Sequence, residues 1–121
     1  MKRYSRQVSG SHGGLNLWLL QRASAIYMAI FLPLFLVYAL VSGPFDYAAW
    51  QAVFVPLGMK VAVLLFVSAL LLHAWIGLRE IFIDYLHCLG CTLLRLAVYF
   101  TFAVLYLACL VWAVDILWSV K

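Results

Sequence analysis

The chain has 121 residues, of which 69% are hydrophobic and only 10% are charged, and its formal net charge at pH 7 is +4. A domain of this length has no interior large enough to hide so much apolar surface, so a water-soluble fold is excluded. The positive charge lies mainly in a basic head, at Lys2, Arg3 and Arg6. We interpret this head as a signal for membrane topology and expect no nucleic-acid partner.

Apolar residues are concentrated in three long stretches, each sufficient to cross a bilayer, which takes about 20 helical residues. We expect spans at about residues 15–42, 57–85 and 91–118, after a polar, glycine-rich arm at residues 1–14. Spanning segments in lipid satisfy their backbone groups by forming helices. Three helices enclose little volume, so we predict an all-α membrane protein whose transmembrane helices form part of a heteromeric bundle.

The first span carries one charge, Arg22, and is followed by Ser42-Gly43-Pro44, a sequence typical of a helix stop. Arg22 precedes the apolar core of the span, so we expect it at the same interface as the basic head. Two interpretations of this residue stay open. It is either a snorkelling anchor or a cation that pairs with an anionic group.

Basic residues are unequally divided between the two predicted sides of the membrane. The connection at residues 42–55 contains neither Lys nor Arg, whereas the second turn is flanked by Arg79 and Arg95 and shares its side with the basic head. The other side has only Lys60 and Lys121. The excess of positive charge places the N-terminus in the cytoplasm and the C-terminus outside.

The second span contains polar groups that an apolar run of this kind does not need. His73 follows a run without charge, and an ionisable group inside a membrane normally faces a protein interior or a cofactor. At 100° per residue, Asp84 returns to within roughly 20° of His73, and Gly77 and Glu80 lie near the same stripe. An imidazole at depth beside a glycine offers a nitrogen ligand and space for a flat haem ring. The alternative is a histidine hydrogen-bonded to a neighbouring helix.

Asp84 and Tyr85 come where this span meets water on the cytoplasmic side. A tyrosine hydroxyl donates a hydrogen bond to a carbonyl oxygen, and a neighbouring carboxylate can orient it or pass protons. A quinone head group needs both services. The alternative is an aromatic-belt tyrosine next to a solvated aspartate.

The three cysteines are Cys88, Cys91 and Cys109. Cys88 and Cys91 form an isolated Cys-x-x-Cys in the predicted second turn. We interpret them as small apolar residues of a tight turn, with a metal or redox pair as the alternative.

Two motifs together resemble a known family, the small hydrophobic membrane anchors, of cytochrome b type, of bacterial succinate dehydrogenase (respiratory complex II). The motifs are Arg22-Ala23-Ser24-Ala25 and His73-Ala74-Trp75-Ile76-Gly77, the latter followed by Asp84-Tyr85 after ten residues from His73. With the three spans and the basic head, the resemblance covers nearly the whole chain.

The resemblance implies a role for each of these residues. His73 would be an axial ligand of the iron of haem b, and the larger cytochrome b partner in the membrane would supply the other. Tyr85 would hydrogen-bond a carbonyl of ubiquinone, with Asp84 supporting that site. Arg22 would lie near a haem propionate or the quinone pocket.

The resemblance also implies a location and partners. The chain would be a multi-pass protein of the bacterial inner (cytoplasmic) membrane, in contact with lipid. Flavoprotein and iron-sulfur subunits would dock on its cytoplasmic side, and electrons from succinate would reduce the quinone there. The chain would then be a subunit of an oxidoreductase without a dehydrogenase site of its own.

Three alternatives stay open at the level of sequence. The chain could be a haem-free anchor that still binds quinone, or the anchor of a quinol:fumarate reductase. It could also be a small proton-relay or transport bundle in which His73, Glu80 and Asp84 form a polar track.

Overall fold

The computed structural model describes the backbone of residues 11–43, 46–86 and 92–121, and side chains within residues 14–43, 46–82 and 92–121. The helices are α1 (Ser11–Val41), α2 (Tyr47–Val53), α3 (Leu57–Leu86) and α4 (Thr92–Ser119). These ranges contain helices and no strand, which confirms the predicted all-α class. By length and composition, α1, α3 and α4 are able to cross a membrane.

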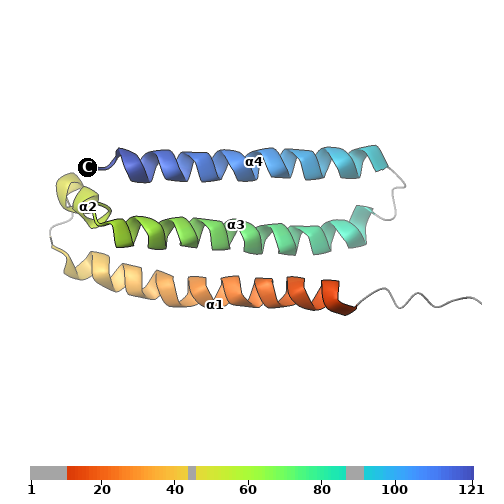
Figure 1. Cartoon of the computed structure of the whole chain (residues 1–121), viewed down its shortest axis with the longest axis horizontal. Coiled ribbons are helices and arrows are strands. Elements are labelled where there is room, and N and C mark those ends of the chain that lie inside the picture. Colours follow the sequence, from red (N-terminus) through yellow and green to blue (C-terminus); the bar gives the residue numbers. More distant parts are fainter. Residues whose placement is uncertain (1–10, 44–45, 87–91) are drawn as a thin grey trace, which may run out of the picture.

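The three long helices lie side by side, with α3 in the middle and in contact with both α1 and α4 (Figure 1). The start of α1, the end of α3 and the start of α4 share one end of the layer, while α2 lies at the other end. Few side chains are buried in the described residues: Val53, Ile76, Leu117 and the polar Ser24. The remaining apolar surface is left for lipid or for helices of other subunits.

The end of α1 follows the predicted stop. Val41 is its last residue, and Gly43 adopts a φ of +117°, a left-handed conformation that favours glycine. The backbone N–H of Ser42 donates to the carbonyl oxygen of Tyr38 at 3.0 Å and closes the last turn. At its other end α1 begins at Ser11, so the helix includes the last residues of the segment expected to be a polar arm.

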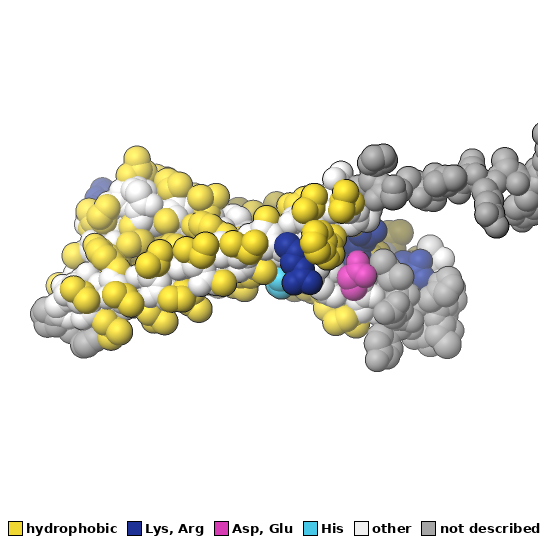
Figure 2. Space-filling view, turned by 90° about the horizontal axis from the view of Figure 1, so that it is seen from below, with side chains coloured by type: hydrophobic (Ala, Val, Ile, Leu, Met, Phe, Trp, Pro, Cys, Tyr) yellow, Lys and Arg dark blue, Asp and Glu magenta, His cyan; other side chains and the backbone are white. Residues whose placement is uncertain are grey.

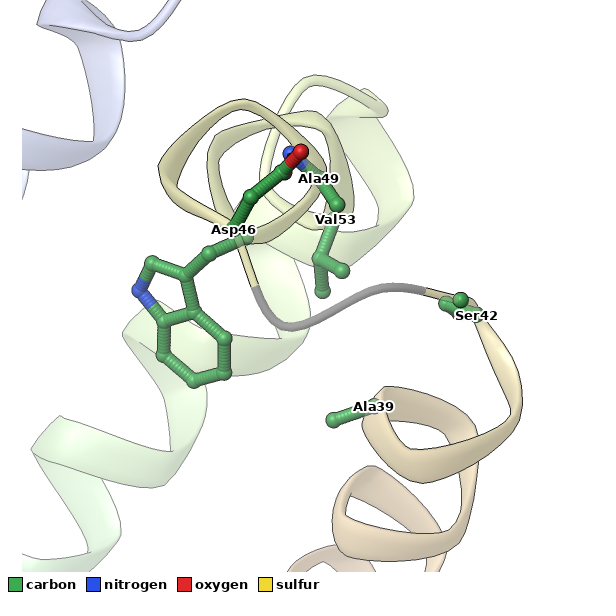
Figure 3. A pocket seen from close by; sticks show the side chains of 7 residues that line it. Ala39, Ser42, Asp46, Ala49 and Val53 are labelled. Atoms are coloured by element: carbon green, nitrogen blue, oxygen red, sulfur yellow. The ribbon is translucent and has the colours of Figure 1, made fainter.

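The short helix α2 lies within the segment that we expected only as an interfacial connection. Asp46 is its N-cap, and the Oδ1 atom of this residue accepts a hydrogen bond of 2.7 Å from the backbone N–H of Ala49. Figure 3 shows Asp46 and Ala49 on α2 near Ala39 and Ser42 at the end of α1. These residues border a pocket of about 200 Å³. The Asp46 carboxylate therefore serves to cap a helix.

Aromatic side chains make many of the contacts between the long helices. The rings of Phe31 on α1 and Phe66 on α3 lie 5.1 Å apart between centroids. Trp75 on α3 packs against Tyr99 and Phe102 on α4, with centroid distances of 5.6 and 5.7 Å. Such pairs are favourable beyond the apolar area they bury, so they fix α3 between its neighbours.

Candidate cofactor site at the contact of α1 and α3

His73 is held by the facing helix α1. Its Nδ1 atom lies 3.2 Å from Ser24 Oγ and 3.2 Å from the carbonyl oxygen of Gln21. The hydroxyl of Ser24 donates a hydrogen bond of 2.9 Å to the same carbonyl. The three groups form one connected unit, the His73–Ser24–Gln21 cluster. The structure thus agrees with a histidine that bonds to a neighbouring helix, but it engages only one of the two ring nitrogens.

The contact with Gln21 determines which ring nitrogen carries the proton. A carbonyl oxygen only accepts hydrogen bonds, so a bond to it requires a hydrogen on Nδ1. In the neutral imidazole, Nε2 then carries the lone pair. Histidines that bind metals usually donate their other ring N–H to a carboxylate, a backbone carbonyl or water. The arrangement at His73 therefore suits Nε2 as a ligand.

The cluster lies in a largely apolar part of the α1–α3 contact. Ser24 is only 6% exposed, and Ile76, one turn after His73, is 3% exposed. The ring of His73 is half-buried. Hydrogen bonds in such surroundings compete little with water, so they hold the imidazole more firmly than they would at a wet surface.

Arg22 lies deeper along the molecule than we expected. It precedes Ser24 by two residues, a rise of about 3 Å, so it lies at nearly the same level as His73. Because α1 begins at Ser11, about three turns of helix separate Arg22 from the start of the span. Its side chain is exposed, and its guanidinium carbon lies 5.5 Å from the centroid of the Trp18 ring. A cation at this depth is costly in lipid, so it favours a polar or anionic neighbour from outside the chain.

A groove of about 590 Å³ lies between α1 and α3 on the side of His73 nearer the start of α1. Its lining combines apolar, aromatic and charged residues: Gly14, Leu17, Trp18, Gln21, Ile76, Arg79 and Glu80. Figure 2 shows basic, acidic and histidine side chains gathered in this part of the molecule, while the rest of the visible face is mostly hydrophobic. Neither the groove nor any chemistry for Arg79 was predicted from the sequence.

Three residues of the predicted stripe follow His73 along α3. A Cβ atom added to Gly77 would meet no atom within 4 Å, so the space beside this residue is open. Asp84 and Tyr85 belong to the last turns of α3, which ends at Leu86. Their side chains are outside the described residues, as are Cys88 and Cys91, so the predicted roles of these residues stay predictions.

Two members of the cluster, Ser24 and Gln21, were missed at the level of sequence. Ser24 entered only as part of a motif, and Gln21 acts through its backbone, which no side-chain pattern reveals. The one available signal was a hydroxyl in an otherwise apolar helix. Within the part of the chain that the structure describes, no three His, Cys, Asp or Glu side chains gather around a common point. A haem iron needs only an axial nitrogen from each side, and His73 offers one.

Comparison with known proteins places this arrangement in a family. A family model described as "Succinate dehydrogenase/Fumarate reductase transmembrane subunit" matches residues 3–114, a range that contains the cluster and Arg22. The chain is also similar to the succinate dehydrogenase hydrophobic membrane anchor subunit of Coxiella burnetii (strain RSA 493 / Nine Mile phase I). The two are 35% identical over 111 residues, which cover 92% of this chain and 94% of that protein. The chain therefore belongs to the family of succinate dehydrogenase/fumarate reductase transmembrane subunits, which confirms the resemblance seen in its sequence.

Proposed function

We propose that the chain is the hydrophobic membrane anchor of a succinate:ubiquinone oxidoreductase in the bacterial inner membrane. Together with a larger cytochrome b partner it would hold haem b and ubiquinone, and it would anchor the flavoprotein and iron-sulfur subunits. The observation that carries this proposal is the engagement of His73 Nδ1 by the Gln21 carbonyl oxygen at 3.2 Å, because it leaves Nε2 for iron.

The residues around His73 fit a haem. When bound, haem b supplies a one-electron carrier inside the membrane. His73 would provide one axial nitrogen, and the cytochrome b partner the other, since this is the one histidine within the candidate spans Gly14–Val41, Leu57–Phe82 and Thr92–Ser119. The open space beside Gly77 suits a flat ring, and Arg22 at the level of His73 suits a propionate carboxylate.

The end of α3 is the proposed site of quinone reduction. Tyr85 would donate a hydrogen bond to a ubiquinone carbonyl, and Asp84 would orient that hydroxyl or pass protons. The groove lined by Trp18, Arg79 and Glu80 lies about one turn of α3 away. Its mixed polar and apolar lining supports a nearby site for an amphipathic ligand, and it leaves Arg22 as a candidate neighbour of quinone as well as of haem.

The distribution of charge supports the proposed orientation. Arg79 and Arg95 lie at the end of the layer where α1 begins, whereas Lys60 and Lys121 lie at the opposite end (Figure 1). With the basic head included, the positive-inside tendency places the first end in the cytoplasm. The flavoprotein and iron-sulfur subunits would dock there, so electrons would enter close to the proposed quinone site. The direction from succinate to quinone follows the name of the Coxiella relative.

The test is a dithionite-reduced minus oxidised spectrum of the complex that co-purifies with the tagged full-length chain. We expect a b-type band together with flavin and an iron-sulfur protein. In His73→Ala the haem-to-flavin ratio should fall at least about tenfold, because an axial ligand is lost. Partners without a b-type band in the unmodified complex would instead indicate a haem-free anchor. A chain that purifies without partners would favour the transport bundle.

A further inference from the structure

We propose that Ser24 is a positioning residue that fixes the tautomer and the ring plane of His73. This inference rests on the proposed haem ligation by His73. It assigns to a hydroxyl on α1 the control of the imidazole on α3, and it predicts that the redox properties of the haem depend on that hydroxyl.

Ser24 differs from the other hydroxyl residues in how it uses its side chain. Ser42, Ser68, Thr101 and Ser119 donate to carbonyl oxygens three or four residues earlier, and no second hydrogen bond is formed by their side chains within the described residues. Ser24 also donates to a carbonyl of its own helix, but its Oγ atom in addition meets Nδ1 of His73 on α3. It is therefore the hydroxyl that joins His73 to α1.

The Gln21 carbonyl cannot satisfy Nδ1 fully by itself. A carbonyl oxygen has two lone pairs, and the ladder of α1 directs the N–H of Ala25 to this one. The Ser24 hydroxyl and the imidazole N–H then share what is left. Because the hydroxyl hydrogen points at the carbonyl, the lone pairs of Oγ are available to accept from Nδ1. The imidazole hydrogen is thus shared between two acceptors at 3.2 Å each.

The burial of Ser24 is not explained by packing alone. The side chain is 6% exposed, and an alanine would fill almost the same space without burying a hydroxyl. Two acceptors on Nδ1–H restrict rotation of the ring and make the imidazole richer in electrons, as outer partners of metal-bound histidines generally do. A more electron-rich ligand stabilises the oxidised iron, so the hydroxyl lowers the reduction potential of the haem.

The test compares Ser24→Ala, Ser24→Thr and Ser68→Ala in the complete complex. Ser68 is a matched control, because it is half-buried in α3 and its hydroxyl bonds only to the Leu64 carbonyl, at 2.8 Å. Three quantities are measured: the haem-to-flavin ratio, the haem midpoint potential, and the electron paramagnetic resonance spectrum of the oxidised low-spin haem. These report retention, ligand electronics and ring orientation separately from turnover.

In Ser24→Ala we expect the potential to rise, the low-spin signal to shift or broaden, and haem to be retained about tenfold less well, since one of two acceptors is lost. Ser24→Thr keeps the hydroxyl and should restore all three quantities, and Ser68→Ala should match the unmodified complex. An unchanged or lowered potential in Ser24→Ala, or an equal rise in Ser68→Ala, overturns the inference. If Ser24→Ala does not assemble, Ser24→Cys decides in the same way, because its sulfur is a weak acceptor.

The same series separates this inference from the proposed function. If the unmodified complex has no b-type haem, or if His73→Ala keeps it, haem ligation itself fails and the inference falls with it. If His73→Ala loses haem while Ser24→Ala equals the unmodified complex, only the role of Ser24 is rejected.

Discussion

The two halves of the α1–α3 pair differ in where their side chains find partners. In the half nearer α2, aromatic rings contact one another in a continuous group within the chain. Phe35 lies 5.7 Å from Phe31, 6.1 Å from Trp50 and 5.9 Å from Phe54 between ring centroids. In the other half, polar groups gather around His73, and several of them have further capacity to bind.

This difference separates structure from function. In the aromatic half, the acidic group Asp46 caps α2, and a groove of about 540 Å³ beside α4 is lined almost entirely by apolar residues. In the polar half, the groove contains Arg79 and Glu80, and Arg22 lies exposed at the level of His73. The first half supports the fold from within, whereas the second presents groups to a cofactor, a quinone or another subunit. Substitutions in the two halves should therefore fail in different ways.

The largest effect should come from Tyr85→Phe, at the end of the polar half. Loss of the proposed hydrogen bond to quinone should lower quinone reduction about a hundredfold, within the usual range for a proton donor. Succinate oxidation by an artificial dye should stay nearly intact, because it does not use the quinone site. Both activities are measured on the same purified complex. An equal fall in both would indicate damage to assembly and would argue against the role of Tyr85.

The next largest effect should come from Phe31→Ala in the aromatic half, and it should be one of stability. Phe31 contacts Tyr27, Phe35 and Phe66, and its loss should cost about 2 kcal/mol, less than for a fully buried ring because the side chain is only half-buried. The melting temperature of the solubilised complex should fall, while the position of the b-type band stays the same. A shifted band with an unchanged melting temperature would contradict the division into halves.

Much of the fold could be predicted from the sequence because lipid imposes simple requirements. Three long apolar runs allow few structures other than helices, and Gly43 marks the end of the first by a conformation that few other residues adopt. The short helix α2 was missed because seven residues give too little pattern to be recognised. Its signal was local, an aspartate at the N-cap position before Tyr47.

The candidate site was only half visible in the sequence. His73 stood out because an imidazole in an apolar run is rare, and its spacing to Asp84 needed only the geometry of one helix. The contact with Ser24 joins residues 49 positions apart, and the register between two helices depends on the packing of many side chains. The same register sets Arg22 at the level of His73. Patterns within one helix do not contain that information.

Arg22 offers a test that sharpens the assignment of the polar half. If it lies near a haem propionate, Arg22→Ala removes a positive charge and should lower the haem potential by the equivalent of about 1 kcal/mol, as for a partly screened charge. Arg22→Lys should keep most of the effect. A raised KM for quinone at an unchanged haem potential would instead place Arg22 at the quinone site. Redox titration and steady-state kinetics of the two variants distinguish these outcomes.

The smallest effect should come from Tyr27→Phe, at the border between the two halves. The hydroxyl of Tyr27 donates a hydrogen bond of 2.8 Å to the carbonyl oxygen of Ala62, and it joins α1 to α3 one turn from Ser24. Removing this bond should lower the stability of the complex by about 0.6 kcal/mol, the mean for hydrogen bonds between membrane helices. The haem potential should not change, because the bond does not involve His73. A shift in potential as large as that of Ser24→Ala would mean that any loosening of the α1–α3 contact moves the imidazole. The polar half would then act as one unit with the aromatic half, and Ser24 would have no special role.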